Sequence, residues 1–355
     1  MKIVCAEAVN FCIFETNQYA YQQKITANHV TRRMRAYKDL DEADFMHFLA
    51  IRIIMGVDRK PFQKHYWTRN EMLGSTIVPK LLTSDRYFEI LQNLHFCDQA
   101  EESEDRLFKL REIWTICNTQ FAKIVVPGPN ISIDESLVLF KGRLVFKQFI
   151  PSKRSRFGMK IFLIVDESTR FILNMIIYTG KGHPLKFNPK DLGHCGAVAL
   201  ELLTPYLQQY RTVYMDNYFT GPILARHLST EKTYLCGTLR KNRKYTTAPE
   251  RMPKGQVKFS TSQDILIQHW KDKKVVSIIS TRHNHEMNSV VTRSGFDIFA
   301  FWHFLTFDIF NFDFFHIDIF AFDRIFFDVF HFGIFCFEVL MKGANRDRFY
   351  YLGRC

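Results

Sequence analysis

The tripeptide Pro127-Gly128-Pro129 divides the chain into two parts with different periodicity. Prolines on both sides of a glycine interrupt helices and strands alike, because proline has no amide donor and the residue before it avoids the helical region. Before this tripeptide apolar residues recur every three or four positions, and after it they form short β-rich runs. We therefore expect a helical domain over residues 1–128, followed by an α/β unit.

Two segments of the first part have the pattern of amphipathic helices. Residues 41–57 begin with acidic side chains, which a first helical turn favours, and continue with apolar residues at helical spacing. Residues 83–96 repeat this design, with Thr83 or Ser84 as the expected N-cap and an apolar stripe that begins at Tyr87.

The part after the tripeptide mixes strands with a helix. Its β-rich runs are rich in Val, Ile, Phe and Tyr, and a helical pattern precedes the last of them. Residues 243–293 are more polar and contain another β-rich patch, so we expect an appended or inserted subdomain there. The expected strands are residues 131–140, 160–169, 171–180 and 211–220, and the expected helix is 197–207.

Two aspartates stand at positions where strands would hold a carboxylate rigidly. Asp134 follows the apolar residues of ISI, and Asp216 follows those of VYM. Mg²⁺ and Mn²⁺ prefer oxygen ligands, and carboxylates from neighbouring strands bridge two such ions in phosphoryl transfer. A turn or cap role is the alternative for each residue, and periodicity alone does not choose between them.

The positive charge of the chain is concentrated after the tripeptide. Lys and Arg number 48 and Asp and Glu 36, and residues 134–293 carry 26 of the basic and 12 of the acidic side chains. A concentrated positive field favours a polyanionic partner, since basic groups that neutralise phosphates release counterions. A basic surface with no such partner is the alternative.

The residues around both aspartates resemble a known family. ISIDESLVLFKGRLVFKQFIPSKRSRFGMKIFLIVDESTRFILNMIIYTGK and VYMDNYFTGPILARHLS are similar, motif by motif, to the catalytic core of piggyBac-type transposases and their domesticated derivatives. The likeness covers about residues 15–293 and includes LTSDRYFEILQNLHF upstream and GTLRKNRK downstream.

This resemblance implies a fold, an activity and a site. The expected fold is an RNase H-like catalytic core with an inserted subdomain, preceded by a helical N-terminal domain for dimerisation or DNA binding. The implied activity is cut-and-paste transposition of double-stranded DNA at TTAA sites with Mg²⁺ or Mn²⁺ held by three aspartates. Asp134 and Asp216 match the first two of these aspartates. The implied domains are 1–128, 129–242 for the core and 243–293 for the insertion.

The third aspartate has no counterpart in the sequence. In the family it lies in a motif that resembles DYNKxMGGVD, which is absent here, and a terminal Cys- and His-rich zinc module is absent as well. We therefore expect a transposase-derived DNA-binding protein with an incomplete core that lacks competent transposition. One alternative is an active nuclease or transposase that recruits a tail carboxylate such as Asp297 or Asp308. The other is a non-functional, aggregation-prone product of a degraded transposon gene.

Two basic clusters are the candidate DNA contacts. Beside a phosphate-cutting site they would position the DNA backbone rather than read bases, and solvated hairpin charges are the alternative. The first cluster comprises Lys141, Arg143, Lys147, Lys153, Arg154, Arg156 and Lys160, and the second comprises Arg240, Lys241, Arg243 and Lys244.

The tail from residue 294 has a different kind of sequence. Seventeen of the 36 Phe residues lie in 296–337, in a five-residue repeat with Asp in register. A period of five places Phe and Asp on every face of a helix or strand. We expect residues 294–341 to be low-complexity sequence, disordered or misfolded, followed by a remnant at 342–355. A pentapeptide-repeat solenoid is the less favoured alternative.

Location and partners follow from the remaining composition. The eight cysteines form no CxxC pair, which argues against a zinc module or a secreted disulfide scaffold. No stretch reaches the roughly 18 uncharged apolar residues of a membrane span. We expect a nuclear protein that binds DNA and forms a possible homodimer, with no membrane and no small-molecule substrate.

Overall fold

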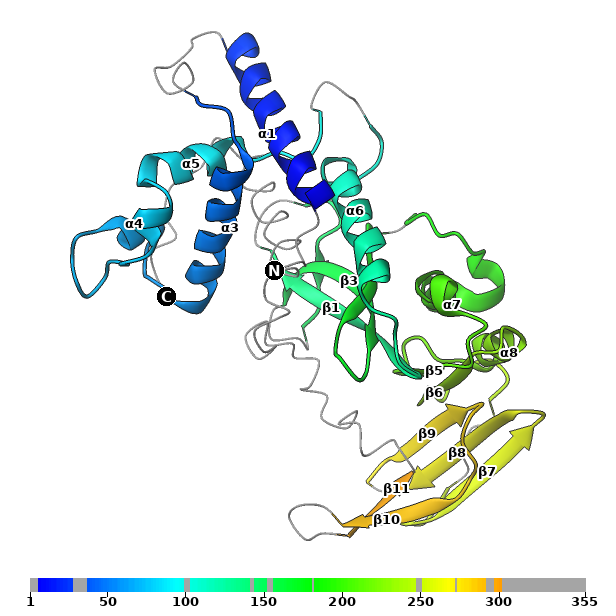
Figure 1. The fold of residues 1–355 in the computed structure, drawn as a ribbon. Helices are drawn as coiled ribbons and strands as arrows, with labels where there is room; N and C mark the ends of the chain where they lie inside the picture. The colour runs from blue at the N-terminus through cyan, green and yellow to red at the C-terminus, as the bar shows by residue number, and fades with distance from the viewer. Residues whose placement is uncertain are drawn as a thin grey trace. The chain divides into compact units, whose positions relative to one another are not determined.

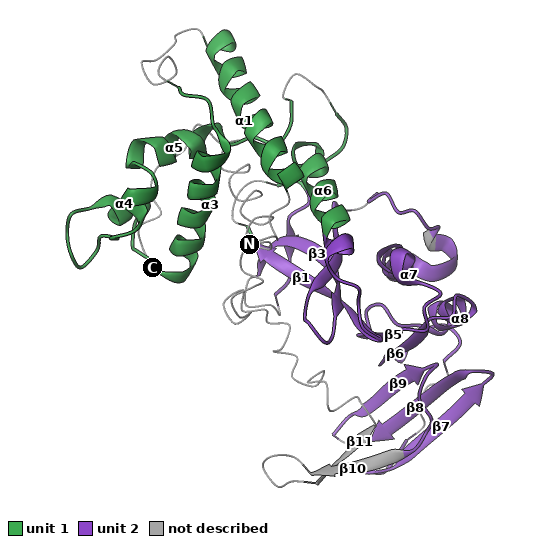
Figure 2. Ribbon diagram, viewed as in Figure 1, with its two compact units in different colours: residues 1–120, 140–145, 322–355 green, residues 121–139, 146–321 purple. Residues whose placement is uncertain are grey.

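The computed structural model of this chain forms two compact units (Figure 2). The first comprises residues 1–120, 140–145 and 322–355, and the second comprises 121–139 and 146–321. The structure describes residues 6–27, 37–98, 103–140, 144–151, 156–180, 182–246, 251–271, 273–291 and 297–301, with residues 189, 287–291 and 297–301 described by backbone alone.

The first unit is helical in its described part (Figure 1). Both predicted amphipathic helices are confirmed as α3 and α5, and Thr83 is the N-cap of α5, where its side chain accepts a hydrogen bond from the Arg86 amide. The described helical elements are α1 (Ala6–Thr26), α3 (Glu42–Val57), η1 (Gln63–Trp67), α4 (Val78–Leu81), α5 (Ser84–Asn93) and α6 (Phe108–Ile124), of which the last runs past the end of the first unit.

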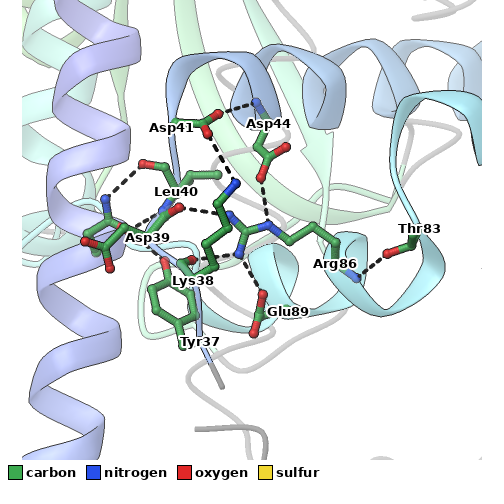
Figure 3. Close-up of polar contacts among 10 residues, drawn as sticks. Tyr37, Lys38, Asp39, Leu40, Asp41, Asp44, Thr83, Arg86 and Glu89 are labelled. Carbon is green, nitrogen blue, oxygen red and sulfur yellow. Dashed lines mark hydrogen bonds and ion pairs between the residues drawn. The ribbon is translucent and has the colours of Figure 1, made fainter. Parts of the chain in front are cut away.

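Arg86 joins α5 to α3 and to the segment before α3 (Figure 3). Its Nε donates to Asp44 Oδ2 at 2.8 Å and its Nη1 to Glu89 Oε2 at 2.6 Å. The same guanidinium donates to the backbone carbonyls of Lys38 and Asp39. Charge-assisted hydrogen bonds of this kind are about twice as strong as neutral ones, so Arg86 fixes the packing of the two helices.

The second unit contains a mixed sheet with the strand order β2-β3-β1-β5-β6-β9-β8-β7, and β4 pairs with β3. The strands are β1 (Asn130–Leu139), β2 (Gln148–Phe149), β3 (Phe157–Asp166), β4 (Ile172–Ile177), β5 (Thr212–Met215), β6 (Tyr234–Thr238), β7 (Val257–Ser262), β8 (Ile265–Lys271) and β9 (Val275–Ser280). A separate two-stranded sheet pairs β10 (Met287–Val291) with β11 (Asp297–Phe301).

Strand direction changes at β1, in the middle of this sheet. β3 runs antiparallel to β1, whereas β5 is parallel to β1 and β6 is parallel to β5. Parallel neighbours need crossover connections, and helices supply them: α7 (Pro189–Leu203) with η2 (Thr204–Tyr206) leads into β5, and α8 (Pro222–Thr230) leads into β6. The predicted α/β character is confirmed at this level, as a mixed sheet with helices.

One core holds the sheet against α7 and α8. Ile131, Ile133 and Val213 from the strands are fully or almost fully buried with Val198 of α7 and Leu228 of α8. Because side chains alternate across a strand, odd-numbered positions of β1 face these helices and Asp134 is on the opposite face.

The sequence also predicts a subdomain at residues 243–293 and a low-complexity tail from residue 294. Residues 257–280 form three strands that extend the same sheet through the pairing of β6 with β9. Of the Phe-Asp tail only residues 297–301 are described, and the rest lies outside the described residues, as does Asp308. The domain boundaries inferred from the sequence therefore stay predictions. Within the described part of the chain, we find no helix with the length and apolar character needed to cross a bilayer.

Candidate active site

Asp134 and Asp216 each follow a paired residue of β1 and β5, at the point where β5 ends. Ile131 pairs with Val213 and Ile133 with Met215 in the parallel pairing of β1 with β5. Asp134 is the next residue of β1, and Asp216 directly follows the last residue of β5. The register thus places two carboxylate residues at equivalent positions of neighbouring parallel strands.

The segment after Asp216 folds back over this residue as a tight turn. Asp216 Oδ1 accepts a hydrogen bond of 2.8 Å from the Tyr218 amide, and the Asp216 carbonyl accepts from the amides of Phe219 and Thr220. The Thr220 hydroxyl donates to the Thr238 carbonyl of β6. Three backbone amides and one side chain therefore hold the turn in one conformation.

The pKa of Asp216 is raised above its ordinary value. Burial of the carboxyl group is the largest cause, and the negative charge of Glu135 adds to it. The amide of Tyr218 and the positive charge of Arg240 act in the opposite direction. A buried carboxylate with a raised pKa is stabilised by any cation that binds beside it.

Gly237 allows β6 to approach β5 beside Asp216. It pairs with Met215, and a Cβ atom at this position would lie 2.3 Å from the Met215 carbonyl oxygen. Real Cβ atoms do not approach backbone oxygens this closely, so any side chain here displaces the strand end that carries Asp216.

Glu135 and Lys160 form a second charged group. They lie on the face of the sheet that is opposite to Asp134. Glu135 pairs with Phe162 of β3, and Lys160 pairs with Leu137. Lys160 is 8% exposed and is followed in β3 by the buried apolar residues Ile161 to Val165. Within the described residues, the Oε2 atom of Glu135 is buried without a hydrogen-bond partner.

The first basic cluster is only partly within the described residues. Arg156 is exposed, and Lys147 is partly exposed with its Nζ 6.0 Å from the Phe157 ring. Lys160 differs from these two because it is buried. The remaining members, Lys141, Arg143, Lys153 and Arg154, lie outside the described residues.

The second basic cluster meets the turn after Asp216. Arg240 Nε donates to Asn217 Oδ1 at 2.8 Å, and Arg243 donates to the carbonyls of Asn217 and Tyr218. Lys241 and Lys244 are exposed. The fold thus brings two arginines 24 and 27 residues away in sequence next to Asp216.

Asp166, another aspartate of this sheet, is buried and has a structural role. Asp166, at the end of β3, accepts hydrogen bonds from the amides of Gly128 and Thr169 and from the hydroxyls of Ser168 and Thr169. Burial opposes its ionisation, but these bonds outweigh burial and lower its pKa. Its oxygens are occupied by the turn between β3 and β4.

The chemical type of the ligand atoms at this site suits a hard divalent cation. Asp134 and Asp216 offer carboxylate oxygens from adjacent strands, the ligands that Mg²⁺ and Mn²⁺ prefer. Among the described residues no group of three or more His, Cys, Asp or Glu side chains is arranged to hold a metal ion. The side chains of Asp297 and Asp308 are not described.

A sequence model of the family described as Transposase IS4 matches residues 1–318 of the chain. The chain belongs to the IS4/piggyBac transposase family. The resemblance seen in the sequence motifs is thereby confirmed, and Asp134 and Asp216 lie within the matched range.

Human relatives and a solved structure agree with this assignment to the IS4/piggyBac family. The chain is 27% identical to human piggyBac transposable element-derived protein 3 over 68% of its length, and 24% identical to human piggyBac transposable element-derived protein 2 over 77%. It spans 42% and 46% of the length of these relatives. The cryo-EM structure of a piggyBac transposase synaptic complex with hairpin DNA matches with a TM-score of 0.68 and 23% identity, over 81% of this chain and 60% of that one. At this identity the likeness shows a shared fold.

Some features of this candidate site are not apparent in the sequence pattern. The burial of Lys160 had one signal, its place inside the apolar run MKIFLIV. No sequence signal predicts the contacts of Arg240 and Arg243 with the Asp216 turn, because these contacts depend on the pairing of β5 with β6.

Proposed function

We propose that the chain is a transposase-derived DNA-binding protein that carries a two-aspartate site for Mg²⁺ or Mn²⁺ and lacks competent cut-and-paste transposition. The observation that carries this proposal is the register of β1 and β5, which pairs Ile133 with Met215, the residues directly before Asp134 and Asp216. The exposed and partly exposed basic residues 240–244, two of which contact the Asp216 turn, support a DNA partner.

We propose that the catalytic core of the protein, formed by strands of the mixed sheet, is RNase H-like. Its support is a mixed sheet in which the antiparallel strands β4, β3 and β1 are followed by the parallel strands β5 and β6. Asp134 lies in the central strand of these five, and Asp216 at the end of its parallel neighbour. The match to a transposase solved with hairpin DNA points to double-stranded DNA as the partner, with TTAA sites as the proposed target.

The metal would be held by Asp134 and Asp216. A bound divalent cation supplies charge neutralisation at the phosphoryl oxygens and activation of a water molecule. The chain's own groups orient the site: the amide of Tyr218 fixes the Asp216 carboxylate, and Arg240 places a positive charge near this carboxylate. We also propose residence in the nucleus, because the proposed partner is DNA, and formation of a homodimer, which the family resemblance implies.

The proposed loss of transposition rests on the missing third aspartate. The sequence has no motif resembling DYNKxMGGVD. With two carboxylates instead of three, a pair of divalent cations remains underneutralised and less firmly placed. DNA binding depends on the basic surface and does not require the third carboxylate.

Fluorescence anisotropy with labelled duplex DNA at several salt concentrations tests the DNA partner. Arg240→Gln and Lys241→Gln each remove one exposed charge of the second basic cluster, just after β6. Lys232→Gln removes one exposed charge just before β6, at the opposite end of that strand. We expect each of the first two to weaken binding of all sequences and to reduce the salt slope by about 1. Wild-type protein that binds no duplex at low salt, or equal losses in all three variants, would contradict the proposal.

A further inference from the structure

Lys160 is a charged residue in a place where the fold offers it little water. It lies in β3, where nine of ten residues are buried, and 8% of its surface is exposed. A buried ammonium group is costly unless other groups compensate it, so its surroundings indicate what it does.

The ammonium group lies over the ring of a residue in the Asp216 turn. Lys160 Nζ is 4.0 Å from the centroid of the Tyr218 ring and 4.8 Å from that of the Phe162 ring. A desolvated cation over an aromatic face is attracted by the negative potential of the ring. Tyr218 is also the residue whose amide binds Asp216 Oδ1.

Lys160 also faces the residue that follows Asp134. In the antiparallel pairing of β1 with β3, Glu135 pairs with Phe162 and Leu137 with Lys160, so all four side chains are on one face. Burial lowers the pKa of Lys160, and the nearby negative charges of Glu135, Asp216 and Asp134 oppose this. Its positive charge therefore acts on both aspartate-bearing segments.

We propose that Lys160 is a positioning residue that couples the Asp134 segment of β1 to the Asp216–Phe219 turn through its contact with the Tyr218 ring and its attraction to Glu135. This inference rests on the proposed function, because it assigns Lys160 to the same two-aspartate site. It gives Lys160 an internal role in place of a contact with the DNA backbone.

Hydrogen exchange of the metal-free protein tests the coupling without DNA or metal. Lys160→Met keeps the length and apolar stem of the side chain and removes the charge. We expect the amides of Tyr218, Phe219 and Thr220, which donate to Asp216, to exchange about tenfold faster in this variant. We expect the midpoint of unfolding to be unchanged or higher, because an apolar side chain replaces a buried charge.

Three further variants serve as controls. Tyr218→Phe keeps the ring and Lys160→Arg keeps the cation, so both are expected to retain the slow exchange of the turn. Lys186→Met removes an exposed charge between β4 and α7 and is expected to change nothing. Unchanged exchange of the turn in Lys160→Met, or faster exchange spread evenly over the second unit, would overturn the proposal.

Mn²⁺ binding, followed by electron paramagnetic resonance of the free ion, is a second test. The direction of the change in Mn²⁺ affinity distinguishes two explanations. Lys160→Met removes a positive charge that repels a cation, so simple electrostatics predicts tighter binding. Positioning predicts the opposite, a severalfold weaker binding, because the two carboxylates lose their alignment. Tighter binding would overturn the proposal. Wild-type protein that binds no Mn²⁺ would refute the proposed metal site, and the exchange experiment would still decide the role of Lys160.

Discussion

Ile133 lies opposite Met215 in the parallel pairing of β1 with β5, and the next residue after each is an aspartate. Backbone hydrogen bonding therefore brings two aspartate residues that are 82 residues apart in the sequence to equivalent positions at the end of β5. Because the pairing of parallel strands fixes this register, the sheet sets the positions of both residues.

Gly237→Ala is expected to damage this arrangement from the neighbouring strand. The new Cβ would lie 2.3 Å from the Met215 carbonyl and 2.4 Å from Thr220 Cγ2, so β6 must move away from the end of β5. We expect a loss of about 1–3 kcal/mol in the free energy of unfolding, measured by urea titration, and weaker Mn²⁺ binding. Gly255→Ala is a control in a turn with open space around the new methyl group, although its φ of 85° adds local strain. Unimpaired Mn²⁺ binding by Gly237→Ala would show that strand spacing does not set the site.

Asp216→Asn is expected to stabilise the metal-free protein at neutral pH. Burial, together with the charge of Glu135, raises the pKa of Asp216, so the folded state holds its proton more tightly than the unfolded state does. Stability of the wild type therefore falls as the pH rises above the unfolded pKa of about 3.9. The neutral amide avoids this loss, and we expect a gain of about 0.5–2 kcal/mol at pH 7 that vanishes near pH 3.5. Urea titrations at both pH values measure it, and a less stable variant at pH 7 would contradict the account.

Arg86→Met is expected to destabilise the helical unit. It leaves the carboxylates of Asp44 and Glu89 without their shared partner, and their side chains retain 21% and 24% exposure. Because solvent reaches both carboxylates, we expect a loss of about 3 kcal/mol, at the lower end of the cost of breaking a buried ion pair. Arg111→Met breaks the more exposed pair with Asp105 and is expected to cost less than about 1 kcal/mol. Equal losses in thermal unfolding would refute the special role of Arg86.

His95 is expected to make the helical unit sensitive to acid. Its ring stacks on Tyr19 with centroids 4.0 Å apart, and burial, together with the charge of Lys109, lowers its pKa from 6.5 to about 4. The unfolded state binds the proton first, so stability is lost as the pH falls from 6.5 towards 4, by roughly 3 kcal/mol in total. His95→Phe keeps an aromatic ring and is expected to flatten stability in this window. A pH dependence equal to that of the wild type would show that other groups cause it.

The sequence predicts those parts of the fold and site that depend on local pattern. The cap at Thr83 and the two acidic first turns identify α3 and α5, and the apolar runs before Asp134 and Asp216 identify β1 and β5. These features depend on hydrogen bonds and burial within a few residues, which a single sequence records directly.

Other parts of the site depend on partners that are distant in the chain. A lysine in a basic stretch reads as a surface charge, yet Lys160 lies over the ring of Tyr218, 58 residues later. In the same way Arg243 contacts the Asp216 turn only because β6 pairs with β5. Periodicity predicts a strand and its faces but not its neighbours, so contacts of this kind need the fold.

Strand cleavage of labelled duplex DNA that contains TTAA sites, with purified protein and Mn²⁺, tests whether the protein binds DNA but lacks competent transposition. Asp134→Ala and Asp216→Ala proteins are the controls, and anisotropy under the same conditions reports whether the DNA is bound. We expect the wild-type protein to bind the duplex and to leave both strands intact. Cleavage by the wild type that disappears in both variants would contradict this expectation and would require a third ligand from outside the described residues.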